Sequence, residues 1–279
     1  MSIRRRGLLG LICVLALSVC AVAAPAQAGK REGSDVLARK SIISGIDANY
    51  ANWAFTAAVY RKGRLHCGGS VIAPTKILTA AHCVEGIDPA KLTVVTGRPN
   101  LRDKTVGAEI GVAAAIAHPD FKETQTHDVG LITLVTPTVA PPIAVPTAAQ
   151  GAALGLPGQL LRIAGWGARN PFGFRLSNVL KETTETIRTD QRCRKTYRRL
   201  FKVPAMICSL GARLKGFGRP AIHTTACTGD SGGPLVSDTA TGPVVVGTVS
   251  FGGAFCGLAA SPTVYSRVSD MLPFLAQFG

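Results

Sequence analysis

Three residues have the types and surroundings that acyl-transfer chemistry needs. Ser231 lies in the run 229–234, where small neighbours leave room for a substrate carbonyl and let backbone N–H groups point at a developing oxyanion. His82 stands beside a cysteine after an apolar run, and Asp128 opens a second apolar run. Alone, each residue is commonly structural, as a glycine-rich turn, a packed histidine or a polar strand start. Together they predict a hydrolase with a Ser-His-Asp triad.

The order of these residues along the chain separates two classes of hydrolase. In an α/β-hydrolase the serine comes first and the histidine last. The last histidine here is His223, so none follows Ser231, and an esterase or lipase of that class is excluded. The order His82, Asp128, Ser231 is the chymotrypsin-type order.

Short β-strands have to position these residues. With 279 residues, 47% of them hydrophobic, the chain is not wholly disordered and can bury the core of one large or two small domains. Brief β-rich runs separated by turns are typical of a closed barrel or a sandwich. A Pro-rich stretch, residues 136–157, divides the strands into two groups, and helices are predicted only over residues 190–200 and 269–278. Strands are predicted over residues 53–60, 65–72, 91–95, 129–135, 160–164, 179–187, 244–251 and 263–268, with a hairpin turn at 61–64.

The first 28 residues have the layout of a secretory signal peptide. Three arginines precede an apolar run, residues 7–24, and Ala26-Gln27-Ala28 provides the cleavage site. An uncleaved membrane anchor is the alternative, and a lipoprotein site at Cys20 is poorly matched. Residues 29–41 are polar and charged, as in a linker or propeptide. We therefore expect a secreted, extracellular protein without stable membrane association.

Removal of the signal peptide leaves six cysteines. An even number in an exported chain predicts three disulfides, although spacing alone cannot choose among fifteen pairings. The six are Cys67, Cys83, Cys193, Cys208, Cys227 and Cys256.

From Ile42 onward the sequence resembles the trypsin/chymotrypsin family of secreted serine proteases. The resemblance implies an all-β fold: two six-stranded antiparallel β-barrels with the active site between them, a C-terminal helix and one short intermediate helix. Residues 42–150 would form the first barrel and residues 151–279 the second. The matching segments are Ile42-Ile43-Ser44-Gly45, Cys67-Gly68-Gly69-Ser70, residues 79–83, Asp128, Gly165-Trp166-Gly167, residues 229–234 and Ser250-Phe251-Gly252.

The resemblance also implies roles for individual residues. Ser231 would be the nucleophile, His82 the general base and Asp128 its orienting acid, while the amides of Gly229 and Ser231 would form the oxyanion hole. The implied disulfides are Cys67–Cys83, Cys193–Cys208 and Cys227–Cys256.

Activation in the resembled family uses a freshly cleaved N-terminal amine that inserts beside the acid next to the nucleophile. Ile42 and Asp230 match these two positions, which would make residues 29–41 an activation peptide. The sequence departs from the usual pattern because Lys40 is separated from Ile42 by Ser41. Cleavage after Lys40 would leave one extra residue, and cleavage after Ser41 would need an unusual activator.

Specificity follows from the residues that match the substrate pocket. Thr225 stands at the pocket base, where trypsin-like enzymes carry Asp, so cleavage after Lys or Arg is not expected. Gly252 leaves one wall open, next to Ser250 and Phe251, and Thr263 replaces a usual Gly and makes the pocket shallower. These features predict cleavage after small or medium apolar residues, with large aromatic residues as the alternative.

No cofactor or metal is expected. Residues 97–106 lack the acidic cluster that a calcium loop needs. The other histidines, His66, His118, His127 and His223, show no metal-ligand spacing and are interpreted as structural or surface residues.

The net charge of +15 is concentrated between residues 188 and 219, which hold ten basic residues and one acid. A solvated helix face or an exosite for an acidic protein or polyanion would both explain this segment, which we call the basic patch. There is no nucleic-acid-binding motif. Two functions remain: a secreted, monomeric endopeptidase acting on proteins or peptides, or a catalytically silent homologue that binds anionic partners through the basic patch. A periplasmic quality-control protease fits less well, because such proteases generally lack this disulfide set.

Overall fold

The structure is a computed structural model that describes residues 41–121, 126–215 and 220–278. The predicted signal peptide and the predicted propeptide up to residue 40 lie outside the described residues. All described residues belong to one structural unit.

Six strands close into an N-terminal barrel in the order β2-β3-β4-β7-β6-β5. The hairpin predicted at residues 61–64 is confirmed: Arg61 pairs with Arg64, and Lys62 and Gly63 both have positive φ, as a tight two-residue hairpin loop requires. Alternate residues such as Ala57, Val59 and Val94 face an aliphatic interior. The strands are β2 Thr56–Arg61, β3 Arg64–Ala73, β4 Lys76–Thr79, β5 Leu92–Thr96, β6 Ala108–Ala117 and β7 Gly130–Leu134.

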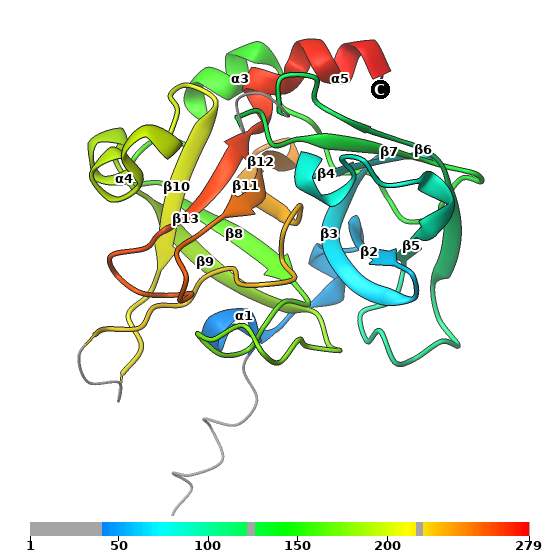
Figure 1. Cartoon of the computed structure of the whole chain (residues 1–279), viewed down its shortest axis with the longest axis horizontal. Helices are drawn as coiled ribbons and strands as arrows, with labels where there is room; N and C mark the ends of the chain where they lie inside the picture. The colour runs from blue at the N-terminus through cyan, green and yellow to red at the C-terminus, as the bar shows by residue number, and fades with distance from the viewer. Residues whose placement is uncertain (1–40, 122–125, 216–219, 279) are drawn as a thin grey trace, which may run out of the picture. The chain divides into compact units, whose positions relative to one another are not determined.

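The remaining strands form a C-terminal barrel in the order β9-β10-β13-β12-β11-β8, and the pairing of β9 with β8 closes it. The strands are β8 Leu160–Gly165, β9 Lys181–Ile187, β10 Met206–Gly211, β11 Pro234–Thr239, β12 Gly242–Phe251 and β13 Thr263–Arg267. A short strand, β1 Ile46–Asp47, pairs with β9 at the outside of this barrel, although it precedes the N-terminal barrel in the chain. The predicted all-β fold of two six-stranded barrels is therefore confirmed, and Figure 1 shows the barrels side by side.

Short helices connect and terminate the barrels. The two predicted helical segments are present as α4 Asp190–Tyr197, continued by the 3-10 turn η4 Arg198–Leu200, and as η5 Val268–Met271 followed by α5 Leu272–Phe278. Helix α3, Ala148–Ala153, was not predicted; a capping box between Thr147 and Gln150 starts it. The other short elements are α1 Ser41–Ser44, whose interior torsion angles are not helical, η1 Tyr50–Asn52, η2 Ala81–Cys83 and η3 Pro89–Lys91.

Five strands, β1, β4, β6, β10 and β11, lie outside the predicted strand ranges. Strand β6 is built largely from Ala and Gly, which carry little β-propensity, and its partners β5 and β7 define it through backbone pairing. Strand β11 begins with Pro234, directly after the two glycines that follow Ser231. Because glycine and proline are typical of turns, the sequence indicates a turn at this point and not the start of a strand.

The two barrels share one apolar cluster. Trp53 and Phe55 from the start of the N-terminal barrel pack in the same cluster as Trp166, Val236 and Phe274. In Figure 1 the C-terminal helix α5 lies at one end of the molecule, and its Phe274 contacts His118, which follows β6. Within the described part of the chain, no helix has both the length and the apolar character needed to span a membrane.

Candidate active site

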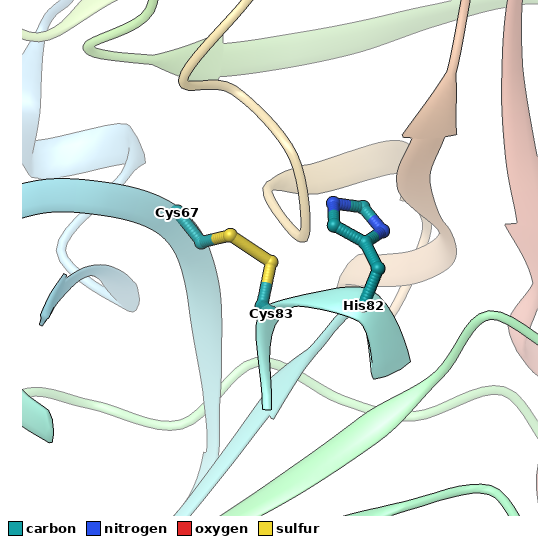
Figure 2. A group of neighbouring side chains, drawn as sticks. All are labelled: Cys67, His82 and Cys83. Carbon is teal, nitrogen blue, oxygen red and sulfur yellow. A yellow bond between two sulfur atoms is a disulfide. The ribbon is translucent and has the colours of Figure 1, made fainter. Parts of the chain in front are cut away.

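His82 is held in the 3-10 turn η2, directly after β4. The disulfide between Cys67 on β3 and Cys83 fixes this turn to the barrel wall, and Figure 2 shows it beside the imidazole. Nδ1 of His82 lies 2.8 Å from Oδ2 of Asp128, and the backbone amide of His82 donates to Oδ1 at 2.9 Å. The two contacts fix both the position of the histidine and the direction of its ring, which leaves Nε2 on the opposite side of the ring from the carboxylate.

Asp128 stands just before β7 and is 3% exposed. Ser250 of the C-terminal barrel donates a hydroxyl hydrogen bond to its Oδ2 at 2.6 Å, so both barrels hold this carboxylate. Burial alone would raise the pKa of Asp128, but the hydrogen bonds and charge interaction with His82 and the bond from Ser250 outweigh it and hold the pKa below the usual value. The carboxylate is therefore ionised at neutral pH.

Ser231 lies in the loop before β11, and its carbonyl accepts a 2.8 Å hydrogen bond from the amide of Gly68 in the other barrel. Along this loop the amides of Asp230 and Gly232 donate to backbone carbonyls at 2.9 and 2.7 Å. Within the described chain, the amides of Gly229 and Ser231 donate to no protein oxygen. Gly229 adopts φ +93°, a conformation that favours glycine. Two neighbouring amides are thus left to bind an anion.

Asp230 is 2% exposed, and its buried carboxyl holds the loop that carries Ser231 through hydrogen bonds to backbone amides. Its Oδ1 accepts from the amide of Gly167 at 2.7 Å and its Oδ2 from the amide of Cys227 at 2.9 Å. Burial raises the pKa of Asp230 to about 7, and the nearby Glu185 carboxyl acts in the same direction. A Cβ on Gly165 or Gly167 would lie within 2.5 Å of this carboxyl, so the glycines of that segment are sterically required.

Ile42, the predicted new N-terminal residue, is 1% exposed and packs with Ile163 and Ala226 inside the C-terminal barrel. The amide of the next residue, Ile43, donates to the carbonyl of Thr225 at 3.1 Å. Ile42 and Ile43 therefore lie against the segment 225–226, which leads to Asp230.

A cavity of about 330 Å³ contains both His82 and Ser231. Five further residues of the predicted set also line it: Gly229, Ser250, Phe251, Gly252 and Thr263. The other lining residues are Ala226, Cys227, Thr228, Gly253, Ser261, His66, Cys67 and Cys256. Thr225 is fully buried and is not among the lining residues; its hydroxyl contacts that of Thr263 at 2.7 Å. The cavity floor is accordingly formed by Thr263, with Thr225 behind it.

Glu185 is a buried carboxyl behind this floor that sequence reasoning missed. It has no exposed surface and accepts hydrogen bonds from Ser209, from the hydroxyl of Tyr265 at 2.7 Å and from the amide of Ala226 at 3.2 Å. Burial raises its pKa, an effect that these hydrogen bonds partly offset. The available signal was strand alternation, because Glu185 shares a face of β9 with the buried Ile187.

Two groups of side chains have the composition of metal ligands. Cys67, His82 and Cys83 come together, but both cysteines are joined in the disulfide and offer no thiolate. In the second group, ligand atoms of His118, Asp120 and His127 lie within 4.8 Å of one another. The two rings stack, Nδ1 of His118 accepts from the amide of Asp120 at 3.3 Å, and Nδ1 of His127 lies 2.9 Å from the hydroxyl of Thr126. These contacts account for the second group without an ion.

Comparison with known proteins identifies the family. The family model described as Trypsin matches residues 42–275. The chain belongs to the trypsin family. A curated relative named Trypsin from Saccharopolyspora erythraea is 32% identical over 229 residues, covering 81% of this chain and 93% of the relative. Serine protease 57 from Rattus norvegicus is 31% identical over 242 residues, covering 84% and 81% of the two chains. As a trypsin-family member, the chain is a serine endopeptidase, a hydrolase that acts on protein or peptide substrates.

The described residues form three disulfides, and their pairing is the one that the family resemblance implies. Cys67 joins Cys83, Cys193 joins Cys208 and Cys227 joins Cys256. The first carries the His82 turn, the second ties α4 to β10, and the third borders the cavity. Disulfides of this number fit an extracellular trypsin-family protein.

Proposed function

We propose that this trypsin-family protein is a secreted endopeptidase in which Ser231, His82 and Asp128 form the catalytic triad. The observation that supports the proposal most directly is the 2.8 Å contact between His82 and a buried, doubly held Asp128, in a cavity that also contains Ser231. A geometry of this kind orients Nε2 of the imidazole toward the serine side of the cavity.

The proposed reaction proceeds through an acyl-enzyme. Oγ of Ser231 attacks the scissile carbonyl carbon while Nε2 of His82 takes the hydroxyl proton, and the carbonyl oxygen becomes an oxyanion. The free amides of Gly229 and Ser231 would donate to that oxyanion; one such donor typically contributes about 3 kcal/mol in the transition state. The C–N bond then breaks as His82 returns the proton to the leaving amine. Water, deprotonated by His82, attacks the acyl carbon and releases the acid and the free serine.

Asp128 would stabilise the imidazolium that forms in both steps. Because its own pKa is lowered, the carboxylate stays ionised while the histidine carries the proton. The hydrogen bond from Ser250 and the amide of His82 hold its two oxygens in place, so His82 keeps the tautomer that accepts at Nε2.

The specificity that we infer is for small or medium apolar residues before the scissile bond. The buried position of Thr225 and the exposure of Thr263 to the cavity support a shallow floor without a charged group at its surface. A panel of chromogenic peptides that differ only in this residue tests it, with the Ser231→Ala variant as the blank. Fastest turnover is expected after Ala, Val or Leu; fastest turnover after Arg or Lys would contradict the inference.

Activation would follow cleavage before Ile42. A free amine at this residue would supply a positive charge for Asp230, a buried carboxyl whose pKa is raised to about 7 without one. The burial of Ile42 and the contact of Ile43 with Thr225 support this placement. N-terminal sequencing of the active, secreted monomer is expected to give Ile42, and a start at Gly29 would rule the mechanism out.

A further inference from the structure

A second cavity of about 490 Å³ adjoins the catalytic one. The two cavities share His82, Ser250 and Phe251. The far wall of the second cavity consists of Phe121 and of the segment after helix α4, which contributes Arg199, Leu200 and Lys202.

The electrostatics of this second cavity favour an anion. Arg199 and Lys202 are both exposed, and neither forms an ion pair with any described residue. The carboxylate on the inner wall, Asp128, already accepts three hydrogen bonds from His82 and Ser250. Among the described residues that line this cavity, Asp128 is the single acid, and its hydrogen bonds already satisfy it, so the two cations face the cavity without an acidic partner there.

The local backbone accounts for the position of these cations. Helix α4 ends at Tyr197, and the next residue, Arg198, has φ 51°, a left-handed conformation that few residues other than glycine adopt. The chain turns there and continues through η4 to the buried Phe201, which anchors the segment between Arg199 and Lys202. The other basic residues of α4, including Arg194 and Lys195, are exposed but do not line either cavity.

Strand β12 supplies a path for a substrate between the two cavities. Strand β11 pairs with β12 only as far as the Pro234–Thr248 pair, whereas β13 continues to pair at Phe251. An extended peptide can add to the open edge at Ser250 and Phe251, as peptides commonly add to an exposed strand. With the residue before the scissile bond in the first cavity, residues farther toward the peptide's N-terminus would pass over the second.

We propose that the second cavity is an anion-binding subsite in which Arg199 and Lys202 select Asp or Glu at one of the positions two to four residues before the scissile bond. The inference rests on the proposed protease function and names its substrate class: peptides with an acidic residue upstream of an apolar cleavage residue. The ligand is a carboxylate of the substrate itself, not a separate polyanion spread over the basic patch.

The test uses the active, secreted enzyme and fluorogenic peptides with one fixed cleavage residue and Glu, Gln or Lys at each upstream position in turn. We expect kcat/KM for the best Glu peptide to exceed that of its Gln counterpart by roughly 3- to 10-fold at low salt, with Lys below Gln. The difference should shrink at high salt, because the two cations are exposed. In Arg199→Gln/Lys202→Gln the ratio of kcat/KM for the Glu peptide to that for the Gln peptide should fall to about 1.

The matched control is Arg194→Gln/Lys195→Gln, which removes the same charge from α4 but touches neither cavity. It should keep the preference for Glu. Equal loss of the Glu preference in both double variants would contradict a local subsite and would indicate a long-range field of the basic patch. An unchanged Glu preference in Arg199→Gln/Lys202→Gln would also contradict the subsite. No preference among cleaved peptides would refute the subsite and leave the protease function standing. Failure to cleave any peptide, with Ser231 unreactive, would refute both.

Discussion

The two barrels differ in what they bury. The interior of the N-terminal barrel is aliphatic, and the carboxylate proposed for its part of the triad, Asp128, contacts Ser250 of the other barrel. The C-terminal barrel encloses two carboxyls, Glu185 and Asp230, which are 0% and 2% exposed. Both accept hydrogen bonds from backbone amides of the segment 226–227 just before the nucleophile.

The two barrels therefore position their active-site residues in different ways. The N-terminal barrel holds His82 through a disulfide and apolar packing, and its active-site pair needs little further organisation. The C-terminal barrel uses buried acids to shape the loop that carries Ser231 and the anion-binding amides. Changes at Asp128 in the first barrel should therefore affect chemistry and stability at acid pH, whereas changes at Asp230 in the second should affect the loop that carries Ser231 and the pH dependence of stability near neutral pH.

The largest effect is expected for Asp128→Asn. The amide NH₂ of the new asparagine would face one of the groups that now donate a hydrogen bond to Asp128. It would therefore favour the wrong tautomer of His82. We expect kcat to fall by about 10⁴-fold with KM nearly unchanged, and the melting temperature at neutral pH to fall only by the modest contribution of the lowered Asp128 pKa. Steady-state kinetics and thermal unfolding measure this. A large fall in melting temperature would show that the N-terminal barrel, too, depends on its carboxylate for stability.

Asp230→Asn should have the second largest effect. Its single oxygen can accept from Gly167 or from Cys227 but not from both, so the loop that carries the Gly229 and Ser231 amides loses one restraint. We expect kcat/KM to fall by roughly 10²- to 10³-fold, comparable to removal of one oxyanion-hole donor. Retention of kcat/KM within about threefold would contradict the organising role of Asp230.

The pH dependence of stability should differ in sign between the two barrels. The pKa of Asp230 is about 7 when folded and near 3.8 when unfolded, so the folded state binds more protons between these values and stability falls as the pH rises through that window. The pKa of Asp128 is lowered, so its contribution is present above pH 3.8 and is lost as the pH falls through its folded pKa.

Denaturant unfolding of the uncleaved Ser231→Ala chain at a series of pH values measures these two contributions. Adding Asp230→Asn should reduce the decline between about pH 4 and 7, and the part that remains is expected from Glu185, whose pKa is also raised by burial. Adding Asp128→Asn instead should leave that decline in place and remove part of the loss at acid pH. Identical pH profiles for the two variants would contradict the comparison of the barrels.

Much of the site could be predicted because its residues lie in short, distinctive segments. Ser231, His82 and Asp128 were predicted as a triad from their neighbours and their order, and the structure brings His82 into contact with Asp128 and places it on one cavity with Ser231. The family resemblance predicted the two barrels and the disulfide pairing. Strand β6 and helix α3 were missed, because a strand built largely from Ala and Gly or a helix of six residues gives little local signal.

The remaining features depend on contacts between distant segments. Glu185 is satisfied by Tyr265, 80 residues away, so its place in the interior follows from strand register and not from its side-chain type. His118 and His127 stack although their spacing suggested no common site. Arg199 and Lys202 belong to the basic patch, which the sequence alone explains equally well as a solvated surface or as a binding site. The turn at Arg198, which the sequence does not predict, brings them to a cavity.

Covalent labelling of the active, secreted protein by an organic fluorophosphonate tests the central claim most directly. The proposed triad predicts one label per molecule, located on Ser231 by peptide mass spectrometry, and loss of labelling in Ser231→Ala and His82→Ala. Labelling on another residue, or no labelling of a folded chain whose N-terminus is Ile42, would contradict it.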